Sequence, residues 1–148
     1  MDNKAGYSEY CQLASCFLRV AIIILSGLIL PLILVTVVKQ TGFTEIFEEI
    51  LKALVVFFLI LKLTSFKESI RIGILFGFLF GVSETFLYFN NICQLGDFNV
   101  FWQRVFLTVP MHIITVLIIL LPSLKSKKNI IWGTLGSIAV HLLFNRFI

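Results

Sequence analysis

Five runs of apolar residues, each about as long as a membrane is thick, restrict the possible folds of this chain more than any other feature. They cover approximately residues 18–38, 44–63, 70–90, 101–121 and 129–147. A transmembrane helix needs about 20 mostly apolar residues, because the hydrocarbon core is about 30 Å thick and a helix rises about 1.5 Å per residue. The sequence therefore predicts an all-α polytopic membrane helix bundle with about five transmembrane helices.

Composition agrees with this class and excludes others. Of the 148 residues 59% are hydrophobic and only 14% are charged, whereas soluble domains are close to half apolar and a quarter charged. The spans and short loops use the whole length, so we expect one integral membrane domain over residues 1–148 and no separate soluble domain. The net charge of +4 lies mostly in loops, which indicates contact with lipid head groups and no nucleic acid as a partner.

The basic residues predict the direction of the spans. Two loops are rich in lysine and arginine: residues 62–71, with Lys62, Lys67 and Arg71, and residues 122–129, with Lys125, Lys127 and Lys128. Residues 91–100 contain neither residue type. Basic loops remain on the cytoplasmic side of a membrane. We therefore expect a cytoplasmic N-terminus and a C-terminus on the other side.

Ionisable residues interrupt four of the five runs at a similar depth. Such residues are costly in a membrane and normally face a bundle interior or a water-filled cavity. Each of these four spans has an ionisable residue thirteen positions from a basic residue of the adjoining loop, which is about 20 Å along the helix. The full set within the spans is Glu48, Glu49, Lys52, Glu84, Arg104, His112 and His141. The sequence thus predicts one polar layer shared by the last four spans.

Helical spacing places these residues on faces with other polar or small residues. Lys52 is three and four residues after the two glutamates, so it can neutralise either. Glycines at every fourth position, which allow close helix packing, precede Glu84. Two further helix faces have such residues at every fourth position: Arg104, Thr108 and His112 on one, and Gly133, Ser137, His141 and Asn145 on the other. Two simpler interpretations stay open: Lys52 and Arg104 extending to the membrane surface, and the whole layer forming an ion or proton pathway.

The order of these motifs resembles a known family. The motifs are Glu48-Glu49-Ile50-Leu51-Lys52, then Phe80-xxx-Glu84, then His112, then His141-xxx-Asn145. Together they resemble the PrsW family of glutamic intramembrane proteases, which is grouped with the CAAX prenyl endopeptidases. The CAAX-type pattern has EExxxR and FxxxH, whereas here Lys52 comes one position earlier and Glu84 replaces that histidine. The resemblance covers residues 44–148 and leaves the first span unexplained.

The resemblance implies an intramembrane endopeptidase in the cell membrane of a prokaryote, multi-pass, cleaving a membrane-embedded or membrane-proximal peptide. It implies Glu48 as the general base that activates water. We expect Glu49 to pair with Lys52, and Glu84 to hydrogen-bond the same water or share a proton with Glu48. His141 and Asn145 would donate to the oxyanion, and His112 would position the water or carry a proton. No serine-protease motif stands out and HExxH is absent, so a metal-independent glutamate mechanism without cofactor is favoured.

Two alternatives use the same residues. In a metal-dependent membrane hydrolase, Glu84, His112 and His141 would bind the ion, because two histidines and one carboxylate are a known ligand set. In a non-catalytic protein, the polar cavity would handle ions or bind a partner's helix, as in a scaffold or immunity protein. The residue types alone do not separate these functions.

Overall fold

The computed structural model describes residues 3–37, 43–63, 65–95 and 98–147 of the chain. In these ranges the chain forms α-helices and short 3-10 turns, without strands. The α-helices are α1 (Asn3–Val37), α2 (Thr44–Phe58), α3 (Phe66–Leu95), α4 (Phe98–Lys125) and α5 (Ile130–Phe147). The 3-10 turns η1 (Ile60–Lys62) and η2 (Lys127–Asn129) follow α2 and α4. The predicted all-α class is confirmed.

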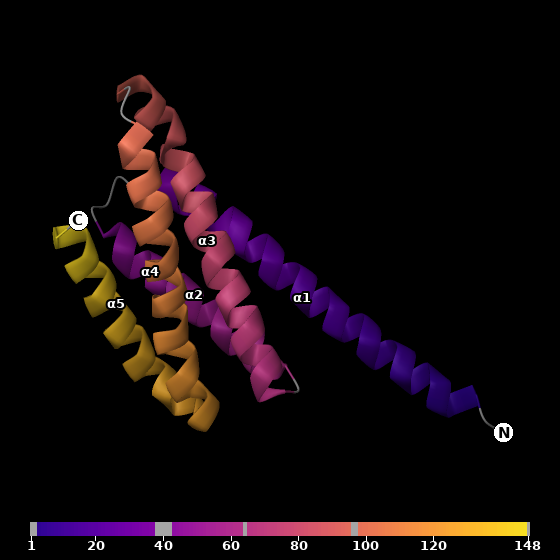
Figure 1. Ribbon diagram of the computed structural model, residues 1–148. Coiled ribbons are helices and arrows are strands. Elements are labelled where there is room, and N and C mark those ends of the chain that lie inside the picture. Colours follow the sequence, from indigo (N-terminus) through magenta and orange to yellow (C-terminus); the bar gives the residue numbers. More distant parts are fainter. Residues whose placement is uncertain (1–2, 38–42, 64, 96–97, 148) are drawn as a thin grey trace.

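The helices form one bundle around the pair α3 and α4 (Figure 1). α4 packs against α5 on one side, and α1 packs against α3 on the other. α2 contacts α1, α4 and α5. The N-terminal half of α1 extends away from the bundle (Figure 1). Both basic loops lie at one end of the bundle, which is called the basic end below.

Four of the helices are long and apolar enough to cross a membrane. The candidate spans contain the predicted spans 70–90, 101–121 and 129–147, and they match most of the span 18–38. The second predicted span, 44–63, differs from the structure. α2 has 15 residues and ends at Phe58, followed by the turn η1. A helix of that length reaches only about 22 Å, short of a hydrocarbon core about 30 Å thick.

α2 and α5 are much shorter than α3 and α4, and this difference shapes the bundle. α3 has 30 residues and α4 has 28, whereas α5 has 18. At the end opposite the basic loops, the α3–α4 hairpin therefore projects beyond the C-terminus of α5 (Figure 1). At that end of the bundle, α3 and α4 therefore extend farther than α5.

The outer surface is apolar, and the interior combines an apolar core with buried charged side chains. Large apolar side chains cover the outside, as on Phe17, Phe106 and Trp132, which are each more than 65% exposed. The interior holds an apolar core formed by Val56, Ile60, Phe76, Phe80, Val116, Ile119 and Leu120. On the other side of Phe80, buried charged and polar side chains occupy the centre of the helix pack. A lipid surround explains both features, since lipid tails are as apolar as leucine side chains.

Contacts near the basic end fix α1 to the start of α3. Arg19 donates a hydrogen bond to the backbone oxygen of Lys62 at 3.0 Å. The thiol of Cys16 lies 3.8 Å from a carboxylate oxygen of Glu68. Inside the same end, the Ser69 hydroxyl donates to the backbone oxygen of Ser65 at 3.1 Å and also lies within reach of the Ile60 oxygen. These bonds satisfy backbone groups where α2 turns into α3.

Candidate functional site

Lys52 lies at the centre of the polar cluster and is fully buried. Its ammonium donates to Glu49 Oε1 at 2.6 Å and to Thr115 Oγ1 at 3.2 Å, and lies 2.7 Å from His112 Nδ1. It also lies 4.6 Å from the centre of the Phe80 ring, a cation–π contact. The lysine therefore does not extend to the membrane surface. It joins α2 to α4 and forms the predicted pair with Glu49.

The partners of His112 define its hydrogen positions. Its Nδ1 faces Lys52, and its Nε2 faces a carboxylate oxygen of Glu84. An ammonium group has donors only, so Nδ1 must accept a hydrogen bond from Lys52. Nε2 then carries the ring hydrogen and donates it to Glu84. The result is a buried chain of hydrogen bonds from Lys52 through His112 to Glu84.

His141 attaches α5 to the two glutamates of α2. Its Nδ1 lies 2.8 Å from Glu49 Oε1, and its Nε2 lies 3.9 Å from Glu48 Oε2. Nδ1 faces the Glu49 carboxylate and donates to it, so in the neutral form of the ring Nε2 is the acceptor nitrogen. The rings of His112 and His141 meet edge to face, with centres 5.4 Å apart. Four helices thus contribute to one cluster, as the equal depths predicted.

Glu48 is the least satisfied member of the cluster. It is 6% exposed, and its Oε2 has no hydrogen-bond partner among the described residues. The same is true of Glu49 Oε2, but the other oxygen of Glu49 accepts hydrogen bonds from Lys52 and His141. For Glu48, the separation of 3.9 Å from His141 is too long for a direct hydrogen bond. A buried carboxylate without partners is costly, so this oxygen needs a proton, a water molecule or a ligand.

Glu48, Glu84 and His112 also have the ligand types of a metal site. One ligand atom from each lies within 4.8 Å of the other two. This set differs from the predicted one, because Glu48 replaces His141. Both nitrogens of His112 are, however, already engaged by Lys52 and Glu84.

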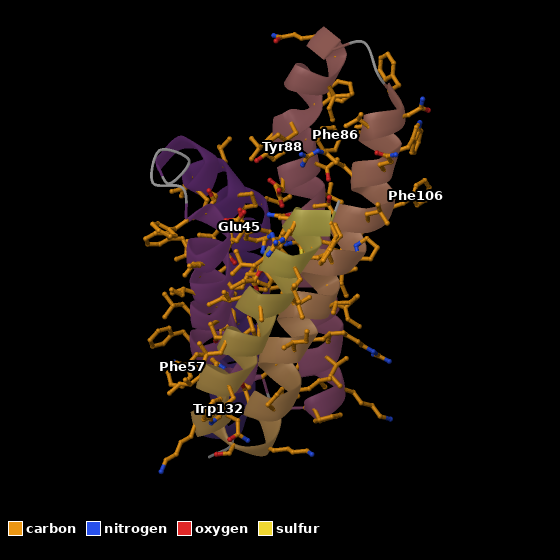
Figure 2. All side chains as sticks on the ribbon, turned by 90° about the vertical axis from the view of Figure 1, so that its left-hand side faces the viewer. Glu45, Phe57, Phe86, Tyr88, Phe106 and Trp132 are labelled. Atoms are coloured by element: carbon orange, nitrogen blue, oxygen red, sulfur yellow. The ribbon has the colours of Figure 1, made fainter. Side chains whose placement is uncertain are left out.

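A cavity of about 390 Å³ opens beside the cluster. Glu84 and His141 lie on its wall, so the cluster can be reached from it. The other walls come from the projecting part of α3 and α4 and from the end of α5, namely Tyr88, Val100, Gln103, Arg104, Thr108, Met111, Phe144 and Asn145. Tyr88 lies farther from the basic end than Glu45, whereas Phe57 and Trp132 lie toward the basic end (Figure 2). The cavity is therefore at the end where the helices differ in height.

Asn145 lies at the edge of the cluster. It donates to Glu45 Oε1 at 2.9 Å and so joins the last turn of α5 to the first turn of α2. Asn145 also lines the cavity, and its second amide hydrogen is not used in this bond. The predicted oxyanion donors His141 and Asn145 therefore both hold carboxylates of α2.

Sequence reasoning did not single out Glu45 and Thr115. Helical spacing could have indicated both, because each lies on the same helix face as a predicted site residue: Glu45 precedes Glu49 by four residues, and Thr115 follows His112 by three. Their partners, Asn145 and Lys52, come from other helices. Only the tertiary structure reveals such pairs.

The glycines of α3 bring the cluster together. A Cβ atom on Gly77 would lie 2.8 Å from the backbone of Ile113, and one on Gly81 would lie 2.8 Å from that of Val109. The same added atom on Gly81 would lie 3.1 Å from the ring of His112. This backbone contact places Glu84 within reach of His112 across the helix pair.

Comparison with known proteins gives a family. The model of the PrsW family, described as intramembrane metalloprotease, matches residues 13–148. The match therefore includes most of α1 and every residue of the cluster. No curated protein and no solved structure matches the chain.

Proposed function

We propose, because this chain belongs to the PrsW family of intramembrane proteases, that it hydrolyses peptide bonds with a water molecule activated by Glu48. The observation that carries this proposal is the buried Glu48 Oε2, which has no hydrogen-bond partner among the described residues and lies 3.9 Å from His141 Nε2. It lies beside three further titratable side chains of the cluster: Glu84, His112 and His141.

The geometry supports a water molecule between Glu48 and His141. Two acceptors 3.9 Å apart can be bridged by one water at ordinary hydrogen-bond lengths of about 2.8 Å. That water would donate one hydrogen to Glu48 Oε2 and the other to His141 Nε2. Its lone pairs would then be free for a carbonyl carbon in the cavity. Transfer of its proton to Glu48 during the attack is general base catalysis.

The leaving amine must receive a proton, and Glu84 is placed to deliver it. Glu84 lies on the cavity wall, whereas His112 is fully buried behind it. The proton taken by Glu48 would pass to Glu84 and then to the amine. Lys52 and His112 orient Glu84 through the buried hydrogen-bond chain and stabilise its charge. The second amide hydrogen of Asn145 is the donor proposed for the oxyanion.

The family description implies a metal ion, and the ligand types of Glu48, Glu84 and His112 agree with one. The contacts of Lys52 do not. A metal on His112 Nε2 would move the ring hydrogen to Nδ1, where it would face the Lys52 ammonium 2.7 Å away. The residues present therefore do not fit a metal bound to His112 while Lys52 holds its position. We propose a metal-independent reaction.

The substrate we propose is a membrane-embedded or membrane-proximal peptide, and the site of action is the cell membrane of a prokaryote. The cavity lies within the helix pack, beside apolar outer surfaces that face lipid. A peptide must therefore approach through the membrane or from the end opposite the basic loops. A strand of a few residues fits a volume of about 390 Å³.

The test is cleavage of single-span peptides by the purified chain in proteoliposomes, read by mass spectrometry. We expect Glu48→Gln to lower the rate about 10²- to 10⁴-fold, the usual contribution of a general base. Glu68→Gln is the matched control. It removes a carboxylate from the first turn of α3, about 24 Å along the helix from Glu84. Unchanged cleavage by Glu48→Gln would contradict the proposed base.

Metal content separates the two hydrolytic mechanisms. We expect active protein to contain no stoichiometric metal and to keep its rate in chelators. A bound ion whose removal stops cleavage, and whose return restores it, would favour the metal-dependent alternative. In that case Lys52 would have to release His112.

A further inference from the structure

One cation on the cavity wall takes no part in the cluster. Arg104 lies on α4, and its guanidinium carbon is 4.1 Å from the centre of the Tyr88 ring. In the described parts of the chain, no carboxylate oxygen lies within 4.0 Å of its nitrogens. This guanidinium is thus held by an aromatic face, with no anion beside it.

Stacking leaves the recognition edge of Arg104 free. A guanidinium carbon 4.1 Å from a ring centre is at the distance of a stacked pair, and stacking leaves the N–H groups in the plane of the guanidinium available to a partner. These groups form a fork that matches a carboxylate with two parallel hydrogen bonds. Tyr88 and Arg104 both belong to the cavity wall, so such a partner would lie inside the cavity and not in lipid. This arrangement differs from an arginine that extends to lipid head groups.

The position of Arg104 gives its distance along α4 from the cluster. Arg104 precedes His112 by eight residues, a rise of about 12 Å along α4. Tyr88 lies one turn beyond Glu84 in the same direction. An extended peptide advances about 3.3 Å per residue, so 12 Å corresponds to three or four residues. An acidic residue next to the bond would instead face Glu48 and Glu84, which repel it.

We propose that Arg104 is a specificity-determining residue, which binds a carboxylate of the substrate three or four residues from the bond that is cleaved. The carboxylate is either an acidic side chain or a free C-terminus, which share the same chemistry. Tyr88 is the positioning residue that holds the guanidinium over the cavity. This inference rests on the proposed function, because it defines the substrate class of the same site.

The test compares matched peptides in vesicles of zwitterionic lipid. A single-span peptide that the wild type cleaves is made with Glu or with Gln at each position two to five residues from the bond. Its C-terminus is amidated. We expect one position, at three or four residues, to favour Glu about 10- to 100-fold in kcat/KM, the value of a charged hydrogen bond. Arg104→Gln should abolish this ratio, and Arg104→Lys should retain part of it.

Charge reversal separates recognition from folding. Arg104→Glu should prefer Lys over Glu at the same position, a gain that damage to the fold cannot produce. Arg146→Gln is the matched control, since Arg146 lies in the last turn of α5, is exposed and does not line the cavity. It should keep the wild-type ratio. Equal cleavage of Glu and Gln peptides by the wild type, or a ratio that survives in Arg104→Gln, would overturn the inference.

Further arms identify the source of the carboxylate and separate this inference from the function. A preference that requires a free C-terminus, and is absent for the side chain, assigns the terminal carboxylate. If Arg104→Gln changes cleavage only in anionic vesicles, and equally for the Glu and Gln peptides, then Arg104 binds lipid head groups and the inference is overturned. Binding of the Glu and Gln peptides to Glu48→Gln protein, with and without Arg104→Gln, tests recognition without cleavage. No cleavage by the wild type, together with selective binding, would contradict the proposed function alone.

Discussion

At the scale of single residues, Lys52 explains why a charged cluster is tolerated inside this bundle. It is fully buried and contacts a carboxylate, an imidazole and a hydroxyl, with Phe80 beneath it. Burying a charge is costly unless it is paired and hydrogen-bonded. Lys52 pairs directly with Glu49 and, through His112, with Glu84, whereas in the described parts of the chain it makes no hydrogen bond to Glu48. The unequal pairing distinguishes the proposed base from the two other carboxylates.

Removal of Lys52 should therefore cost stability as well as activity. We expect Lys52→Met to lower the free energy of unfolding by about 3–5 kcal/mol, because it leaves Glu49 as an uncompensated buried charge. The measurement is unfolding by sodium dodecyl sulfate in mixed micelles, followed by tryptophan fluorescence. Lys67→Met is the control, since Lys67 is exposed at the start of α3 and should change stability by less than about 0.5 kcal/mol.

The double variant Glu49→Gln/Lys52→Met tests the pair itself. It should be more stable than the sum of the two single changes predicts, by about 1–3 kcal/mol, as for residues in one buried network. Strictly additive losses would show that Lys52 acts through shape and not through charge.

At the scale of elements, the contact between α3 and α4 determines whether the cluster can form. Three glycines one turn apart face α4, but they differ in what they meet. An added Cβ on Gly73 would meet side-chain atoms alone, 2.7 Å from the end of Leu120 and 3.7 Å from Val116, whereas on Gly77 and Gly81 it would meet backbone. The two tight positions are the ones beside His112. Close approach is therefore concentrated where Glu84 must reach the histidine.

Alanine substitutions should separate these positions. We expect Gly77→Ala to reduce stability by about 1–3 kcal/mol, as overpacking of a tight contact does, and to reduce cleavage further by moving His112 away from Glu84. Gly136→Ala on α5 is the matched control. Its added Cβ would lie 3.3 Å from the Cγ2 atom of Ile118, a side chain that can shift by a few tenths of an ångström. Melting temperature in detergent and cleavage rate are the two measurements, and an equal response of both variants would contradict the packing argument.

At the scale of the whole molecule, helices of unequal length give access to a polar site inside an apolar bundle. α2 begins and α5 ends near the level of the cluster, as the bond between Glu45 and Asn145 demonstrates. α3 and α4 continue beyond this level (Figure 1). Tyr88 on α3 and Arg104 on α4 line the cavity there. The site is therefore open toward one end of the bundle and closed by the apolar core toward the basic end.

The direction of the bundle in the membrane remains a prediction from the basic loops, and cysteine labelling tests it. Cys93 is exposed near the end of α3, and Ser126 is exposed in the basic loop after α4. In a chain whose only cysteine is Cys93, we expect a membrane-impermeant maleimide to react from outside intact cells. In a chain whose only cysteine is Ser126→Cys, it should react only in inverted vesicles. The opposite pattern would place the opening of the cavity on the cytoplasmic side.

The sequence by itself determined the class and the charged members of the cluster, although it also included Arg104 and missed Thr115. Apolar runs that are long enough to cross the hydrocarbon core as helices leave few alternatives to a helix bundle. Because a charged residue in such a run must face inward, the counted depths of Glu49, Glu84, His112 and His141 were enough to predict that they meet. The match of residues 13–148 to the family agrees with the order of the same motifs.

Only the tertiary structure decided the length of α2, the pairing within the cluster and the shape of the cavity. Helical periodicity gives the face of a residue but not its partner, since pairs such as Lys52 with His112 lie 60 residues apart. Spacing allowed Lys52 to neutralise either glutamate, and packing against α4 and α5 selected Glu49. Among the residues that the structure describes, that choice leaves Glu48 Oε2 without a hydrogen-bond partner. Local sequence specifies which groups are buried, whereas the register between helices specifies which of them stay unsatisfied.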